Sequence, residues 1–219
     1  GISLRRRRSW CVPADPEFAR KAADIVGLYL NPPHNAVVLA VDEKPHIQAP
    51  ERAQGWLRLP DGKALTSFSH GYKRHGTTTL FAALEVATGQ VTAGHDRRRR
   101  RRDFLDFMNQ IAGLYEGFEL HIILDNLNTH KPKRDRWLQR HPNVHFHYTT
   151  AYTSWLNQIE VWFSILSRRA FEGASFTSPY EVREAIDRFI EAYNQNAAPF
   201  EWTKADVKQR PFVQSYADL

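Results

Sequence analysis

Two acidic residues of this chain each follow a stretch of sequence that predicts a buried strand. Asp42 comes directly after the apolar run 36–41, and Asp125 comes directly after the run 120–124. Such runs are typical of strands covered on both faces, and ligands of open α/β sheets gather beyond the carboxyl ends of parallel strands. If the two strands are neighbours, the carboxylates face each other, and a proton or a cation must relieve their repulsion. Oxygen ligands of this kind suit Mg²⁺ or Mn²⁺.

A third acid for such a site comes from a predicted amphipathic helix. The apolar stripe of this helix consists of Trp155, Ile159, Trp162, Phe163 and Leu166. Glu160 lies roughly 120° around the helix from the centre of that stripe, beside the polar residues Asn157 and Ser164. Its carboxylate can therefore lean from the edge of the packed face toward the sheet. The alternative is that Glu160 is a solvated acid on the outer side of the helix.

The remaining pattern predicts the elements that would hold these acids in place. Strands are expected at 37–41, 77–86, 91–93, 120–124 and 144–148, with the first one ending at Asp42 and Glu43 and a turn at 60–62. Helices are expected from Asp15–Pro16 to Asn31, over 104–114, in a short segment from Lys131, over 155–166, and from Ser178 onward. A hairpin joined to parallel strands, with helices between them, predicts one mixed α/β sheet with helices on both faces.

Composition excludes several classes of protein. The 219 residues are 42% hydrophobic and 25% charged, which is typical of a globular domain. No apolar run approaches the roughly 18 residues that a membrane helix needs. The single cysteine, Cys11, cannot form an internal disulfide, and no signal-peptide pattern opens the sequence, so a cytoplasmic location is expected.

Three sequence blocks resemble the signature blocks of a known family. They are Val41-Asp42-Glu43-Lys44, the block 124–130 that contains Asp125, and the block 154–160 that ends in Glu160, with 34 residues between the last two acids. In order and spacing they closely resemble the transposases of the insertion sequence 630 family, the bacterial branch of the Tc/mariner superfamily of DDE transposases. The resemblance extends from Trp10 to about Arg210.

This resemblance implies a fold and an activity. The fold would be RNase H-like, of the retroviral integrase type, with Asp42, Asp125 and Glu160 as the acidic triad that holds two divalent ions, Mg²⁺ or Mn²⁺. The enzyme would cleave a phosphodiester at a transposon end and then use the freed 3′-hydroxyl to attack target DNA, typically at TA. Its partners would be double-stranded DNA and a second copy of itself, and its location the bacterial nucleoid.

The resemblance also implies a division of the chain. Residues 1–14 would be a linker, 15–33 an N-terminal helix and 34–219 the catalytic domain. Complete family members carry helix-turn-helix modules that recognise the transposon ends. Too few residues precede the first strand here to form those modules, so sequence-specific end binding is expected to be weak or absent in this chain.

Polar residues close to the triad are candidates for supporting roles. Asn126, Asn128 and His130 follow Asp125 and could bind a phosphate or orient the triad, as could Asn157. The alternative for the first three is ordinary turn chemistry. Lys44 and Lys131 are candidates for phosphate contacts. Strand alternation points Glu43 to the face opposite Asp42, as a surface or salt-bridge residue.

A run of six arginines precedes the predicted helix at 104–114. Its members, Arg97, Arg98, Arg99, Arg100, Arg101 and Arg102, together with Arg5–Arg8 exceed the net charge of +6, so positive charge is concentrated at two places. We expect the six to bind the DNA backbone. The alternative is a solvated helix N-terminus, although positive charge there opposes the helix dipole.

Two other functions fit the same residues. One is an RNase H-like nuclease that hydrolyses DNA without joining strands. The other is a domesticated, non-catalytic DNA-binding module, against which the three intact acids argue.

Overall fold

The computed structural model describes residues 15–58, 64–150 and 153–201, and of residues 53–58 and 64–70 it describes the backbone only. The proposed linker 1–14 and the predicted turn at 60–62 therefore lie outside the described residues. In the described part, no helix has the length and apolar character required to cross a membrane.

A five-stranded mixed sheet forms the centre of the molecule, in the order β3-β2-β1-β4-β5. Its strands are β1 (Ala36–Arg58), β2 (Ala64–Glu85), β3 (Val91–Asp96), β4 (Glu119–Leu124) and β5 (Val144–Tyr148). β1, β2 and β3 pair in antiparallel fashion, whereas β4 is parallel to both β1 and β5. The predicted mixed sheet is confirmed, and β1 and β4 are neighbours, with Ala40 opposite Ile123.

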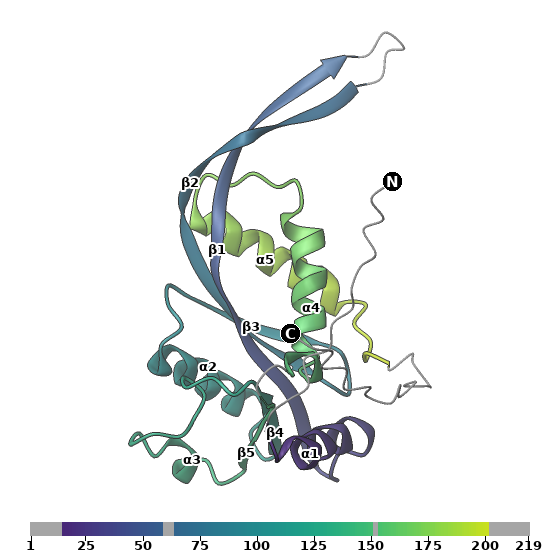
Figure 1. The fold of residues 1–219 in the computed structure, drawn as a ribbon, viewed down its shortest axis with the longest axis vertical. Helices are drawn as coiled ribbons and strands as arrows, with labels where there is room; N and C mark the ends of the chain where they lie inside the picture. The colour runs from purple at the N-terminus through teal and green to yellow at the C-terminus, as the bar shows by residue number, and fades with distance from the viewer. Residues whose placement is uncertain (1–14, 59–63, 151–152, 202–219) are drawn as a thin grey trace, which may run out of the picture.

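The first strand does not end at Asp42 and Glu43, so that prediction was wrong. β1 continues to Arg58 and pairs with β2 along a hairpin that projects well beyond the helices (Figure 1). Its apolar run stops, but alternate residues such as Ile47 and Ala49 remain buried, and backbone pairing with β2 carries the strand onward. A register shift between Lys44 and Ile47, with His46 at a φ of 55°, marks a bulge just past the acidic residues.

The helices begin where local chemistry allows. They are α1 (Phe18–Leu30), α2 (Arg101–Leu114), α3 (Trp137–Arg140), α4 (Ile159–Leu166) and α5 (Pro179–Asn194), with short helical segments η1 (Ser154–Leu156) and η2 (Ser167–Phe171) beside α4. The predicted start of α5 is confirmed, because the Ser178 hydroxyl accepts a hydrogen bond from the Glu181 backbone N–H at 3.3 Å.

Three predicted helix starts lie too early in the chain. α1 begins at Phe18, because the Asp15 carboxylate accepts the Glu17 N–H in a preceding turn rather than capping the helix. The short helix begins at Trp137 and not at Lys131, and α4 begins at Ile159, so that Trp155 lies in the separate turn η1.

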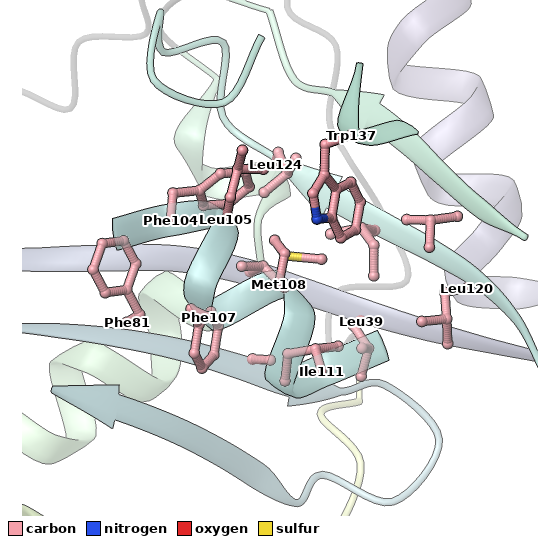
Figure 2. Close-up of a cluster of buried hydrophobic side chains, with 14 residues drawn as sticks. Leu39, Phe81, Phe104, Leu105, Phe107, Met108, Ile111, Leu120, Leu124 and Trp137 are labelled. Carbon is pink, nitrogen blue, oxygen red and sulfur yellow. The ribbon is translucent and has the colours of Figure 1, made fainter. Parts of the chain in front are cut away.

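Buried side chains cover both faces of the sheet. On one face α2 packs over Leu39, Val41 and Phe81 (Figure 2); on the other, α4 and α5 pack over Ala40 and Leu80. A third cluster joins α1 to Val38 and Ile123. Because side chains alternate along β1, successive residues at its centre face different layers, which decides where its acidic residues go.

Candidate active site

Two acids meet at the carboxyl end of β4, where β1 runs past it. The ligand atoms of Asp42, Asp125 and His130 all lie within 4.8 Å of one another. Asp42 is only 6% exposed, and its Oδ1 accepts the backbone N–H of Glu43 at 2.8 Å. Two carboxylates and a ring nitrogen this close together form a group of the size that a single cation can bridge.

The surroundings of Asp42 disfavour its charged form. Burial raises the pKa of Asp42 to about 8, and the negative charges of Asp125, Glu43 and Glu160 add to the effect, against one stabilising hydrogen bond from the Glu43 backbone. A strongly raised pKa in a cluster of acids is typical of a site built for a cation. The residues present therefore fit a divalent metal ion with oxygen ligands.

The loop after β4 fixes Asp125. Its Oδ1 accepts the backbone N–H of Leu127 at 3.2 Å and lies 2.6 Å from Nδ1 of His130. The loop folds back so that the His130 N–H reaches the Leu127 carbonyl at 3.1 Å. Tyr148 at the end of β5 donates its hydroxyl to the His130 carbonyl at 3.1 Å.

His130 lies buried between two carboxylates. Its Nδ1 faces Asp125 and its Nε2 lies 2.8 Å from Oε2 of Glu43. Although burial opposes the charged form, the hydrogen bonds that the ring donates to Asp125 and Glu43 raise the pKa of His130 to about 10. In the metal-free protein the ring therefore braces Asp125, and its Nδ1 must release a proton before it can join the two acids in holding a cation.

Glu160 lies at the edge of this cluster. It is in the first turn of α4 and exposed to solvent, and in the described part it is not among the atoms within 4.8 Å of one another. Partial burial of its carboxyl raises the pKa of Glu160; the charge of Lys44 opposes this and that of Asp125 adds to it. Glu160 is thus close enough to Asp42, Asp125 and Lys44 for their charges to interact.

Asn157 joins α4 to the strand that carries Asp42. It is fully buried, and its Nδ2 donates to the carbonyl of Val41 at 3.1 Å. Its backbone carbonyl accepts the Glu160 N–H at 3.1 Å. The buried Oδ1 of Asn157 has no hydrogen-bond partner in the described part of the chain. This residue therefore ties the start of α4 to the residue preceding Asp42.

Three other predicted site residues are not part of the cluster. Asn126, Asn128 and Lys131 are exposed in the loop after β4, and their side chains make no hydrogen bond to any described residue. The structure leaves them free to reach a ligand, but does not bring them to the carboxylates.

The arginine run divides into two groups. Arg101 is largely buried: it binds Asp135 at 3.0 Å and donates to the carbonyls of Thr129 and His130 at 3.1 and 2.9 Å. Arg100 forms a two-pronged bond with Asp103 at 2.9 Å. These two residues therefore make bonds within the protein, and the expectation that the whole run binds DNA stays a prediction.

The other arginines remain exposed. Arg97 and Arg98 make no ion pair with a described residue, and Arg102 is 3.9 Å from Asp103 with its side chain 76% exposed. Arg99 lies between the groups, with its guanidinium 3.7 Å from Oε1 of buried Glu43. At the N-terminus of α2 some arginines are therefore exposed to solvent, whereas others are bound to acidic residues of the protein.

Glu43 is a salt-bridge residue, as one of the two alternatives expected, but its place beside the acid cluster was not predicted. Alternation along β1 correctly turns it away from Asp42, toward the face covered by α2. It is not at the surface, however, because His130 and Arg99 enclose its carboxylate. The available signal was a charged residue continuing a buried strand, which requires a buried partner of opposite charge.

The sheet order, the helices on both faces and the acids where β1 passes the end of β4 define the RNase H-like class of folds. The chain belongs to a family in that class: residues 37–183 match the model of the DDE superfamily endonucleases. No curated protein sequence matches the chain significantly.

Solved structures of Mos1 transposase share the fold. The Mos1 paired-end complex with the left transposon end aligns with a TM-score of 0.60 at 13% identity, over 88% of this chain and 60% of that one. A mariner Mos1 paired-end complex with Mg aligns with a TM-score of 0.56 at 15% identity, over 87% and 60%. A third, with Mn, aligns with a TM-score of 0.55. The chain thus spans 60% of the length of these Mos1 chains.

Proposed function

We propose that this chain is the catalytic domain of a DNA transposase of the insertion sequence 630 family. Membership of the DDE superfamily endonucleases and a fold shared with Mos1 transposase support the class of reaction. The three sequence blocks around Asp42, Asp125 and Glu160 support the particular family. The observation that carries the proposal is the pair of strand acids, Asp42 and Asp125, held at one point of the sheet.

In this proposal Asp42, Asp125 and Glu160 hold two divalent ions, Mg²⁺ or Mn²⁺. Mos1 structures with Mg and with Mn support the choice of metal. When bound, such ions activate the attacking oxygen and stabilise the leaving oxygen of an in-line phosphoryl transfer. Burial raises the pKa of Asp42, and the charges of Asp125 and Glu43 add to the effect; bound cations would offset both, so the arrangement of the acids favours metal binding.

The chain's other residues prepare this site. His130 binds one oxygen of Asp125 and is itself held by Glu43, which limits the orientations open to that carboxylate. Asn157 fixes the start of α4 against β1, which keeps the helix turn that carries Glu160 close to Asp42. Fixed positions of this kind lower the cost of assembling a reactive geometry.

The substrates would be the transposon end and the target duplex, and the active assembly a dimer on DNA. The Mos1 chains seen in paired-end complexes support both expectations. Lys44 is close enough to Glu160 for its charge to lower the pKa of Glu160 against the effect of burial, and Lys131, Asn126 and Asn128 are exposed in the loop that follows Asp125, so in this proposal these side chains bind phosphates of the DNA.

A strand-joining assay tests the proposal. The chain is mixed with a labelled duplex that has a free 3′-hydroxyl, a supercoiled plasmid and Mn²⁺. We expect joined product with the unaltered chain, and neither joining nor hydrolysis with Asp125→Asn, which should still be retained on DNA. Hydrolysis without joining would replace the proposal by a nuclease, and DNA retention without either reaction would replace it by a binding module. Activity in Asp125→Asn would overturn the assignment of the triad.

A further inference from the structure

A broad groove lies beside the start of α2 and the start of α5. It has a volume of about 1040 Å³, and its basic lining comes from several separate segments. The connection from β3 to α2 supplies Arg97, Arg98 and Arg100, and α2 itself supplies Arg102. Arg183 comes from α5 and His75 from β2.

The arginine from α5 is held in position by the sheet. Arg183 Nε donates to the hydroxyl of Thr78 at 2.9 Å, and Thr78 donates in turn to the carbonyl of Asp96 at 3.3 Å. This chain of bonds joins α5 and β2 to the point where the arginine run begins. Arg183 is therefore part of the same surface as the run, although 81 residues separate it from Arg102.

Little negative charge offsets the arginines of this groove. Asp96 is the only acid that lines it, and its Oδ1 already accepts the backbone N–H groups of Arg97 and Arg98. Arg100 is paired with Asp103, whereas Arg97 and Arg98 have no acidic partner in the described part of the chain. The surface carries uncompensated positive charge, which attracts a polyanion.

We propose that this groove binds the phosphate backbone of double-stranded DNA, with Arg183 as a contact that the arginine run alone does not provide. The inference rests on the proposed transposase function and adds the surface along which the duplex lies. Guanidinium groups suit phosphate because they donate in a planar fork. Small-molecule pockets are mostly apolar, whereas this lining is mostly charged and polar, so an extended polyanion fits this groove better than a small ligand.

The lining favours a duplex over a single strand. Proteins that bind single strands combine positive charge with aromatic side chains on which bases stack. Among the residues that line the groove, only Tyr180, which is 67% exposed, has a phenyl or indole ring. Arginines from separate elements without a stacking platform match contacts to the backbone alone, which carry no sequence information.

A matched pair of variants on one helix tests the proposal. Arg183→Gln removes the charge in the groove, and Arg188→Gln removes a charge from the same helix among Glu184, Asp187 and Glu191, outside the groove. Binding of a fluorescent 30-base-pair duplex is followed by anisotropy, in EDTA, across a series of salt concentrations. Circular dichroism establishes that both variants are folded.

We expect Arg183→Gln to weaken duplex binding about tenfold and to lower the slope of log affinity against log salt by about 1. Arg188→Gln should change neither, and Arg183→Lys should recover the slope. Equal behaviour of the two glutamine variants, or tighter binding of a single strand than of the duplex, would overturn the proposal. Because EDTA removes metal, this result is independent of the strand-joining assay. The binding experiment can reject the groove without rejecting the acidic triad, and the strand-joining assay can reject the triad without rejecting the groove.

Discussion

Nδ1 of His130 lies 2.6 Å from Oδ1 of Asp125, while the opposite nitrogen of the same ring lies 2.8 Å from Glu43. The imidazole thus connects an acid on one face of the sheet to an acid at the end of the neighbouring strand. Phe104 of α2 covers the ring, with centroids 4.7 Å apart. Orientation of Asp125 is consequently linked to packing of α2 on the sheet.

Replacing His130 by alanine should destabilise the protein by about 3 kcal/mol, because the buried carboxylate of Glu43 loses its closest partner. Urea unfolding of the metal-free protein at pH 7 measures this loss. His145→Ala is the matched control: it removes an exposed histidine that pairs with Glu119, and should cost less than about 1 kcal/mol. Equal losses of unfolding free energy in the two variants would contradict a stabilising role of His130 between Glu43 and Asp125.

Stability of the metal-free protein should fall as pH rises from 4.5 to 6.5. Asp42 keeps its proton up to about pH 8 in the folded state, whereas in the unfolded chain it releases the proton near its ordinary pKa of 3.8. Folding therefore takes up a proton in this range, and the contribution of Asp42 is a slope of at most about 1.4 kcal/mol per pH unit. Asp42→Asn should flatten the dependence. An unchanged slope in that variant, measured by urea unfolding, would argue against a desolvated Asp42.

Two arginines of one run should respond in opposite ways. Arg101→Gln should lower the free energy of unfolding by about 2 kcal/mol, since its bonds to Asp135 and to two loop carbonyls are largely buried. Arg97→Gln should leave stability within about 0.5 kcal/mol but weaken duplex binding. Thermal unfolding measures the stability of the two variants, and anisotropy measures their binding to the duplex. If both variants lost stability and DNA affinity to the same extent, the two arginines would not have separate roles.

The sheet and its acids were predictable because their signals are local. Apolar runs locate the strands, and an acid at the end of each run locates a site at the carboxyl edge. The extension of β1 to Arg58 was not predictable in this way, because it depends on pairing with β2 rather than on the strand's own apolar residues.

Contacts between segments far apart in the sequence account for the other features that the sequence did not predict. Glu43 and His130 are 87 positions apart, and only the path of the loop after β4 brings them together. Arg101 and Asp135 meet for the same reason. Sequence spacing gave Glu160 a place on its helix, but its distance from the strand acids depends on how α4 packs against β1.

Asn157→Ala should weaken Mn²⁺ binding about tenfold, as loss of a residue that supports metal ligands typically does. The substitution removes the bond to the Val41 carbonyl and loosens the start of α4, from which Glu160 projects. Electron paramagnetic resonance of free Mn²⁺ gives the affinity. Asn128→Ala, an exposed substitution in the loop after β4, should leave the affinity unchanged; if both variants or neither lose Mn²⁺, Asn157 has no such role.

Anomalous diffraction from crystals soaked in Mn²⁺ tests the central claim most directly. Two strong peaks are expected within ligand distance of Asp42 and Asp125, one of them also contacted by Glu160 after a rotation of its side chain. His130 should remain bound to Asp125 and Glu43. Peaks elsewhere on the molecule, with none between the two strand acids, would contradict the account.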